Sequence, residues 1–494
     1  MNTNEITVQK EGFFKKWGLV IGAIVLLIFV LMPTIEGLTV AGQRMIGIFL
    51  FAVIVWMSST VSYPVSAIII MTLIAVLLGT APDIADTTKL MGTSKALKMG
   101  ISGFSSTAFL LVAAAMFISV AMMKTGLDRR IALTMLSKVG AKVSHIYLGC
   151  IACGFVLGFF VPSSTARVAC VLPIIMGILN IMDIDHRSKF AGLLVIGVAQ
   201  ADTMWNIMIQ TAAAQNMVAV EFINSELNAT VPWINWLLAA APFSLILAVI
   251  YYFLSMAIHK PSFDILPGGV TAIAKMKSDL GPMTKDEKKL SVVLILLLFF
   301  WSTGGILHNF DTSTTTIIAI ALLMLPKIGI MDWKYTAPRI NWGTIVMFGP
   351  GISLGTALLK TEGATWLAKM LNSGLGLSSA TPLAIIAIMG AFLILIHLGF
   401  ASATALSSAM IPIVISVLQT VTGEINVVGM TMILQFSCCF GFIFPVNSPQ
   451  GMVAYGTDTF EAKDFIKSGV PITIIGYLLL LVFAATYWKW IGLV

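Results

Sequence analysis

Long apolar runs separated by short polar stretches make up most of this chain. The clearest runs are 18–32, 39–57, 62–79, 106–123, 190–208, 234–257, 290–306, 341–359 and 471–489. A helix of about 20 apolar residues can cross the hydrocarbon core of a bilayer. The pattern therefore predicts an all-α polytopic membrane protein, and with the shorter runs it indicates about eleven transmembrane helices.

Two further apolar runs are interrupted by small polar residues. The interruptions are "PSST" at 162–165 and "ASAT" at 401–404. The apolar arms on either side are about 15 residues long, which is short for a complete crossing. A polar tip between two short arms predicts a re-entrant hairpin, whose tip must face protein or water. We expect one such hairpin over 147–182 and a second over 383–419.

The two interrupted runs resemble one another, and the likeness extends beyond them. Ten residues separate Ser163 from Pro173, and ten separate Ser402 from Pro412. The peptide "QNMVAV", from residue 215, follows the first run, and "QGMVAY", from residue 450, follows the second. Similar peptides in the same order predict an internal duplication.

A polar stretch at 258–289 divides the two copies. With a first span set aside, each half contains an odd number of crossings, so the halves are predicted to be inverted relative to each other. We expect a first half over 1–257, a cytoplasmic linker over 258–289 and a second inverted repeat over 290–494. Secondary transporters commonly have this architecture, with substrate bound at mid-membrane between discontinuous helices.

Composition and charge agree with a membrane protein. Only 10% of the residues are charged and 58% are hydrophobic, whereas soluble domains carry about 25% charged residues. The net charge of +7 comes from loops, which favours a role in orientation over nucleic-acid binding. The partner it implies is the lipid bilayer. Basic residues flank the first, fourth and later spans: Lys10, Lys15, Lys16, Lys124, Arg129, Arg130, Lys138, Lys142, Lys327, Lys334 and Arg339.

This distribution predicts a multi-pass protein of the cell membrane with a cytoplasmic N-terminus. The loop 80–104 departs from the rule, because it carries three lysines where an outside loop is expected. No small-residue cleavage site closes the first apolar run, so we expect 18–32 to be retained as a span.

The chemistry of the two tips favours an anion. The first amides of a helix lack intrahelical partners, and the helix dipole attracts negative charge there. Ser163, Ser164 and Thr165 add hydroxyl donors at the first tip. Ser402 and Thr404, with the small Ala403 between them, offer the same chemistry at the second. Such residues also serve as ordinary helix caps and packing contacts. Two tips at matched spacing favour a site for a molecule with a carboxylate at each end.

Ionisable residues near the tips are further candidates, because charge within a membrane segment is costly. Arg167 lies four residues after Ser163, and His397 lies five residues before Ser402. Asp202 is a weaker candidate near a helix break. The five cysteines lie in apolar sequence and suit packing, and the five histidines form no cluster, so neither a metal centre nor an enzyme is expected.

With these tips, and with text such as "FGPGISLGTALLKTEGATWLAKML" at 348–371, nearly the whole chain resembles the divalent anion:sodium symporter (DASS, INDY-type) family. The resemblance implies that loops matching 211–216 and 446–451 complete the substrate site, which adds Gln215, Asn216, Asn447, Ser448 and Pro449. It also implies a homodimer in which a transport domain moves against a scaffold like an elevator.

The chain departs from the family at both tips. The family carries Ser-Asn-Thr there, whereas this chain has Ser163-Ser164-Thr165 and Ser402-Ala403-Thr404, so both asparagines are missing. In the family these motifs help to ligate sodium, so sodium is doubtful here and no other cofactor is expected. "PSxTAR" and "HxxFAS" resemble the family's exchanger branch, and Arg167 and His397 would supply fixed positive charge in place of sodium.

The predicted function is therefore a sodium-independent exchanger of C4–C6 di- and tricarboxylates such as succinate, malate, fumarate and 2-oxoglutarate, with a second carboxylate as counter-substrate. The alternative within the class is a sodium- or proton-coupled symporter. A channel or a membrane enzyme is the remote alternative.

Overall fold

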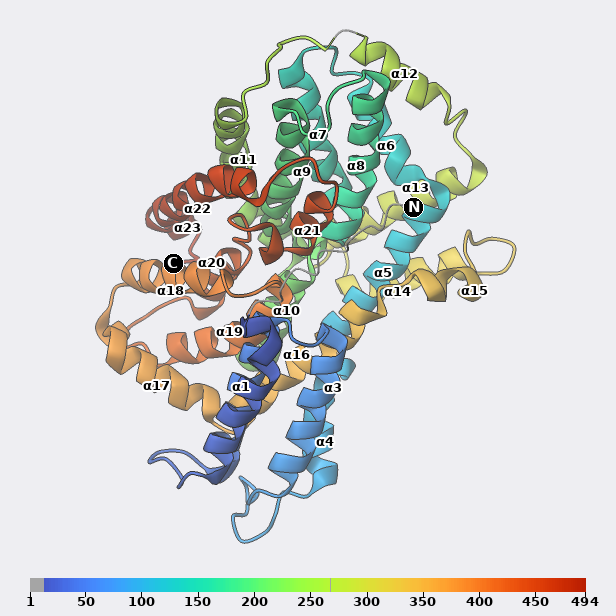
Figure 1. Cartoon of the computed structure of the whole chain (residues 1–494). Coiled ribbons are helices and arrows are strands. Elements are labelled where there is room, and N and C mark those ends of the chain that lie inside the picture. Colours follow the sequence, from blue (N-terminus) through green and yellow to red (C-terminus); the bar gives the residue numbers. More distant parts are fainter. Residues whose placement is uncertain (1–12, 267) are drawn as a thin grey trace, which may run out of the picture.

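The computed structural model describes residues 13–266 and 268–494, and these residues form helices and loops without a β-strand among them (Figure 1). Lys10 and Pro267 lie outside the described residues. In the described part, eight helices are long and apolar enough to cross a membrane, and six further apolar helices are shorter. The chain is an all-helical polytopic membrane protein; the count of about eleven spans stays a prediction.

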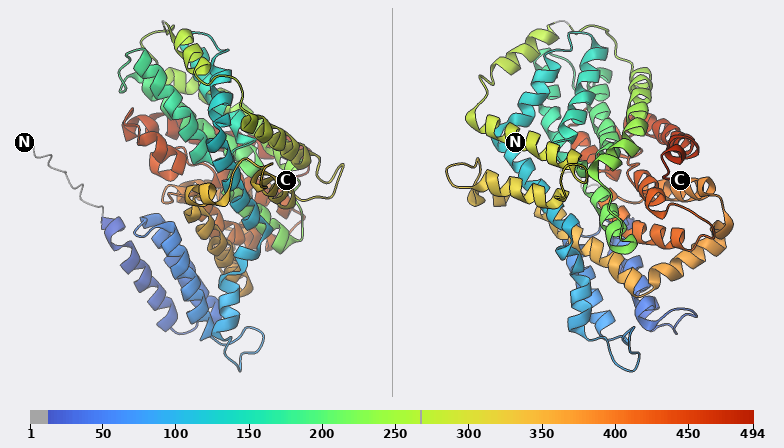
Figure 2. Two further views of the ribbon diagram at one scale, coloured as in Figure 1. Left: turned by 90° about the vertical axis from the view of Figure 1, so that its right-hand side faces the viewer. Right: turned by 180° about the vertical axis from the view of Figure 1, so that it is seen from behind.

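The helices up to residue 100 form a group at one end of the molecule, drawn in blue in Figures 1 and 2, and the next two helices lead away from it. α1 packs along α2 at short distance, since a Cβ on Gly47 would lie 2.8 Å from the Cβ of Phe29. Ile24, Leu27 and Ile28 of α1 are exposed, as a lipid-facing helix requires. The elements are α1 (Phe13–Leu31), α2 (Val40–Ser58), α3 (Tyr63–Leu73) with the wider turn η1 (Ile74–Leu78), α4 (Thr93–Gly100), η2 (Ser102–Ser105), α5 (Thr107–Thr125) and α6 (Leu127–Leu136).

The first interrupted run forms two helices that pack on each other and on a central helix. The central helix, α9, is buried from Phe190 to Met208. The elements of this region are α7 (Val143–Gly158), α8 (Ser164–Ile181), α9 (Lys189–Met208), the short turn η3 (Gln210–Ala212), α10 (Ala214–Leu227) and α11 (Trp233–Ile258). The predicted interruption at the tip is present as the gap between α7 and α8, and a second helix end follows at Met208 of α9.

The second half repeats this order after a further series of helices. Its elements are α12 (Gly269–Ser278), α13 (Lys285–Thr303), α14 (Thr312–Met324), α15 (Trp333–Thr336), η4 (Ala337–Arg339), α16 (Trp342–Lys360), α17 (Gly363–Leu375), η5 (Leu377–Ser379), α18 (Pro382–His397), α19 (Ala403–Gln419), α20 (Val427–Cys438), η6 (Pro445–Asn447), α21 (Pro449–Tyr455), α22 (Ala462–Ala485) and α23 (Tyr487–Trp490). Thr422, after α19, hydrogen-bonds through its amide and hydroxyl to the carbonyl of Ser378, before α18. The second arm thus returns to where the first arm began.

The two halves exchange helices, because the helix that follows each break packs against the opposite half. α10, which follows the first break, packs against α19 and α20 of the second half. α21, which follows the second break, packs against α8 and α9 of the first half, and in Figure 1 it lies beside them. Each candidate half-site therefore borrows a helix from the other half.

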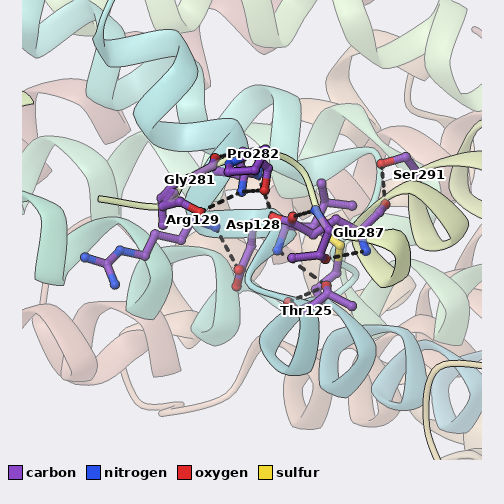
Figure 3. Close-up of polar contacts among 12 residues, drawn as sticks. Thr125, Asp128, Arg129, Gly281, Pro282, Glu287 and Ser291 are labelled. Carbon is purple, nitrogen blue, oxygen red and sulfur yellow. Dashed lines mark hydrogen bonds and ion pairs between the residues drawn. The ribbon is translucent and has the colours of Figure 1, made fainter. Parts of the chain in front are cut away.

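The polar stretch 258–289 contains α12 and the start of α13, and one arginine ties it to the first half. Arg130 of α6 donates from Nε to Glu287 Oε1 at 2.6 Å. Its Nη1 and Nη2 groups donate to the carbonyls of Leu280, Gly281 and Pro282. Figure 3 labels Gly281, Pro282 and Glu287 of this region together with Asp128 and Arg129 of α6. We call the cluster formed by Arg130, Glu287 and residues 280–282 the linker clamp.

Candidate functional site

Both tips have the same local geometry. Ser163 and Ser402 are N-caps with extended backbone, at φ −141° and −147°, and their hydroxyls accept from the amides of Ala166 and Ala405, each at 3.3 Å. A serine in this role satisfies one of the amides that a helix start leaves open. Ala403 is the first residue of α19.

The two threonines of the tips remain available for a ligand. Thr165 and Thr404 lie in the first turns of α8 and α19 and are half-buried. Within the described residues, neither hydroxyl has a hydrogen-bond partner. An open hydroxyl beside open helix amides is a suitable donor pair for a carboxylate.

Arg167 is fully buried beneath the first tip and does not lie free in it. Its Nε and Nη2 groups donate to the two oxygens of Asp202, at 2.7 and 3.0 Å, so the carboxylate balances its charge. Its Nη1 group donates to the carbonyls of Val161 and Ala212, at 2.6 and 2.9 Å. The fifth N–H, on Nη2, meets Asn206 at 2.5 Å. All five donors of the guanidinium have protein partners.

Asn206 is a residue that the sequence analysis did not single out. It lies on α9, one turn after Asp202, so the two side chains share a face of the helix. Its side chain contacts both Arg167 and the tip serine Ser164, and its backbone carbonyl accepts from Asn216 at 2.6 Å. The signal that could have found it is the i, i+4 pair of polar residues within an otherwise buried helix.

In the second half, an asparagine amide donates to the backbone carbonyls that precede the tip, as Arg167 does at the first tip. Asn447 Nδ2 donates to the carbonyls of His397, Leu398 and Phe400, at 3.1 to 3.2 Å, and so caps the end of α18. His397 is buried, and its Nε2 lies 3.2 Å from the carbonyl oxygen of Asn447. Ser448 caps α21 by accepting from the amide of Gly451 at 3.2 Å, followed by Pro449 in the first helical position.

The turn after α20 connects the two networks. Cys439 Sγ lies 3.6 Å from Asn216 Oδ1 and 3.8 Å from Gln215 Nε2. Two residues later, a Cβ on Gly441 would lie 3.3 Å from both the imidazole of His397 and the carbonyl oxygen of Asn447. This turn therefore contacts candidate residues of both halves, Gln215 and Asn216 of the first and His397 and Asn447 of the second.

The sequence of the whole chain matches a known family. A profile described as "Sodium:sulfate symporter transmembrane region" matches residues 14–494. The chain belongs to the divalent anion:sodium symporter family. The resemblance stated from the tips is confirmed, and the protein is a membrane transporter and not an enzyme.

Several relatives of this DASS transporter are known by name. It is 51% identical over 96% of its length to a "Membrane protein" of Cupriavidus necator, of which it covers 93%. It is 27% identical to an "L-tartrate/succinate antiporter" of Escherichia coli, over 80% of this chain and 81% of the relative. It is 23% identical to a "Citrate/succinate antiporter" of Escherichia coli, over 94% and 96% of the two chains.

The fold also matches a solved transporter. The crystal structure of the Alcanivorax borkumensis YdaH transporter superposes with a TM-score of 0.54 over 87% of this chain and 98% of that one, at 13% sequence identity. At this identity the match concerns the fold alone. A polytopic transporter fold is therefore shared by the two proteins.

Proposed function

We propose that this DASS transporter exchanges C4–C6 di- and tricarboxylates without sodium. Two relatives are named as antiporters of succinate with tartrate or citrate, which supports the substrate class and the exchange. The paired tips support a ligand with a carboxylate at each end, because each tip offers helix amides and an unpaired threonine hydroxyl. Thr165 and Thr404 are the proposed direct donors, with Ser163, Ser164 and Ser402 around them.

The observation that carries sodium independence is the position of the Arg167 guanidinium. It lies among oxygen atoms of Val161, Ala212, Asp202 and Asn206, which are the ligand type that sodium requires. A protein cation held by five hydrogen bonds leaves no room for a metal cation among the same oxygens. In the second half, the amide of Asn447 and the ring of His397 use the carbonyls in the same way.

The exchange itself follows from the cost of moving an empty site. Because Asp202 balances Arg167, the groups left unbalanced without substrate are the helix N-termini and hydroxyls of the tips. Unpaired polar groups in a low-dielectric barrier are costly, and a dianion bound between the tips offsets that cost. The loaded carrier should thus cross readily and the empty carrier slowly.

The proposed architecture for this mechanism keeps the predicted elements. The α7–α8 and α18–α19 pairs act as re-entrant hairpins of two inverted repeats joined by 258–289. The repeats move as an elevator domain against a scaffold, in a homodimer of the cell membrane whose N-terminus faces the cytoplasm. About eleven spans would complete this arrangement.

Counterflow tests the proposal. Proteoliposomes loaded with unlabelled succinate should accumulate labelled succinate in sodium-free buffer, and internal malate, fumarate or 2-oxoglutarate should replace succinate as the driving substrate. Vesicles loaded with sulfate serve as the control. The symporter alternative predicts uptake that depends on external sodium, or on a proton gradient, whatever the vesicles contain.

A further inference from the structure

The contact between Arg167 and Asn206 fixes which way the asparagine amide faces. A guanidinium has only donors, so the atom it meets must be an acceptor. Arg167 Nη2 meets Asn206 Oδ1 at 2.5 Å, and the reverse orientation would set N–H groups against N–H groups. The orientation of this amide is therefore determined by the ion pair beneath it.

With Oδ1 held by Arg167, the other end of the amide faces the tip. Asn206 Nδ2 donates to Ser164 Oγ at 3.0 Å. The hydroxyl hydrogen of Ser164 is not used in that bond, and without a ligand it can turn back to Asn206 Oδ1 at 3.2 Å. A carboxylate at the tip is the stronger acceptor, because hydrogen bonds to an ionised group are about twice as strong as neutral ones.

The asparagine is itself held firmly. It is 2% exposed, within a helix that is buried along its length. Its backbone carbonyl accepts from Asn216 Nδ2, which lies in the first turn of α10. Ser164, by contrast, is half-buried at the surface of the tip. The chain of contacts thus runs from a buried ion pair, through a fixed amide, to a hydroxyl at the tip.

We propose that Asn206 is a positioning residue of the substrate site, which holds Ser164 Oγ through its amide so that the serine hydroxyl donates to a substrate carboxylate. This inference rests on the proposed function. In this scheme Arg167 acts on the substrate through Asn206 and Ser164, which gives a purpose to a guanidinium that has no donor left over. Asn206 touches the serine and not the substrate.

A double-mutant cycle tests the coupling. Succinate affinity is measured by calorimetry on the purified full-length protein for the wild type, Asn206→Leu, Ser164→Ala and the double variant. Each single substitution should weaken succinate binding by about tenfold, the effect of one hydrogen bond to a charged group. The double variant should be no weaker than the weaker single variant, because both substitutions remove the same donor.

A matched asparagine controls for loss of a buried amide. Asn372 is buried and donates to the hydroxyl of Thr420, at the end of α19 remote from the tip. Asn372→Leu should leave succinate affinity unchanged within about twofold. Asn206→Asp, which keeps the acceptor facing Arg167, provides a variant of nearly identical shape in case the leucine does not fold. The aspartate has an acceptor where the asparagine donates to Ser164. Asn206→Asp should therefore weaken succinate binding when Ser164 is present, and weaken it less when Ser164 is already replaced by alanine.

The outcomes separate the inference from the function on which it rests. Losses that multiply in the double variant, or unchanged affinity in both Asn206 variants, overturn the positioning role while leaving carboxylate binding intact. A wild type that binds none of succinate, malate, fumarate and 2-oxoglutarate overturns the proposed function, and this inference with it.

Discussion

At the scale of single residues, the candidate site contains two kinds of polar group. The tip threonines are half-buried and unpaired in the described residues, whereas Arg167 and Asp202 are fully buried and paired with each other. Removing a group of the first kind changes what a ligand meets. Removing a group of the second kind first changes the stability of the folded protein. The two kinds therefore give different results on substitution.

Thr165→Val and Thr404→Val should each weaken succinate binding and leave folding intact. Valine keeps the shape and removes one hydroxyl donor to a carboxylate, worth about 1.5–3 kcal/mol or roughly ten- to hundredfold in affinity. Substrate-dependent thermal shift measures the effect, with Thr314→Val, on the exposed start of α14, as a control. Wild-type affinity in both tip variants would remove these hydroxyls from the site.

Arg167→Ala should strongly destabilise the protein, because Asp202 would remain buried without its partner. Breaking such a pair costs about 3–5 kcal/mol, whereas replacing both members by apolar residues is often neutral. Arg167→Met with Asp202→Leu should thus recover much of the unfolding temperature. Exchange should stay impaired in this double variant, since Asn206 is no longer oriented. An alanine variant that unfolds at the wild-type temperature would contradict the account of the ion pair.

Sequence alone predicted the tip residues but not their partners. Ser163 and Ser402 are local caps whose role depends on the next three residues, so the pattern suffices to find them. Asp202 and Asn206 act on residues 35 to 42 positions away, through helix packing that no local pattern encodes. The sequence therefore suggested an unbalanced charge on Arg167, whereas the structure pairs it with Asp202.

At the scale of elements, the linker clamp connects α6 to the start of α13. Burial of the Glu287 carboxyl raises its pKa. Hydrogen bonds from Arg130 and Thr284 outweigh this effect and hold the pKa below its ordinary value of 4.5. A carboxyl with a lowered pKa stabilises the folded state above the ordinary value, and that contribution is lost as the pH falls through the folded-state pKa.

Glu287→Gln should accordingly lower the unfolding temperature at neutral pH, because a neutral amide binds Arg130 less strongly. The difference from wild type should stay constant down to about pH 4.5 and shrink below it, where the wild-type carboxyl itself becomes protonated. Thermal unfolding of both proteins across this range measures it. A difference that grows on acidification would contradict the clamp.

Labelling tests the two hairpins as elements. Cysteines introduced at His145, in the first turn of α7, and at Asp185, after α8, are at exposed positions and should react from the same side of the membrane. Cysteines at Ser379 and Glu424, which flank α18 and α19, should react from the opposite side. Replacing Cys170, which is half-buried, by serine removes the native background. Labelling of His145 and Asp185 from opposite sides would make the first pair a true crossing.

The helix breaks were predictable because neighbouring residues mark each one: a capping serine, a proline, or a short polar run. The course of the chain after each break was not. Sequence similarity between "QNMVAV" and "QGMVAY" predicts that α10 and α21 correspond, but only packing reveals that each contacts helices of the opposite half. The similarity of the two helices can be read from their peptides, whereas their contacts with the opposite half depend on how the whole chain packs.

At the scale of the whole molecule, the exchanged helices make the two half-sites interdependent. The turn at 439–441 contacts Asn216 of one half-site and His397 of the other. In the proposed function, N–H groups of the protein occupy the oxygen atoms that a sodium ion would need as ligands in both half-sites. We therefore expect substrate binding to be a property of the whole core, without a contribution from sodium.

The most direct test of this account is net uptake into proteoliposomes that contain no dicarboxylate. With an inward sodium gradient, such vesicles should take up no labelled succinate above the protein-free background. The same preparation, loaded with unlabelled succinate, should take up labelled succinate rapidly with or without sodium. Sodium-driven accumulation in the vesicles lacking internal dicarboxylate would contradict sodium-independent exchange and establish a symporter.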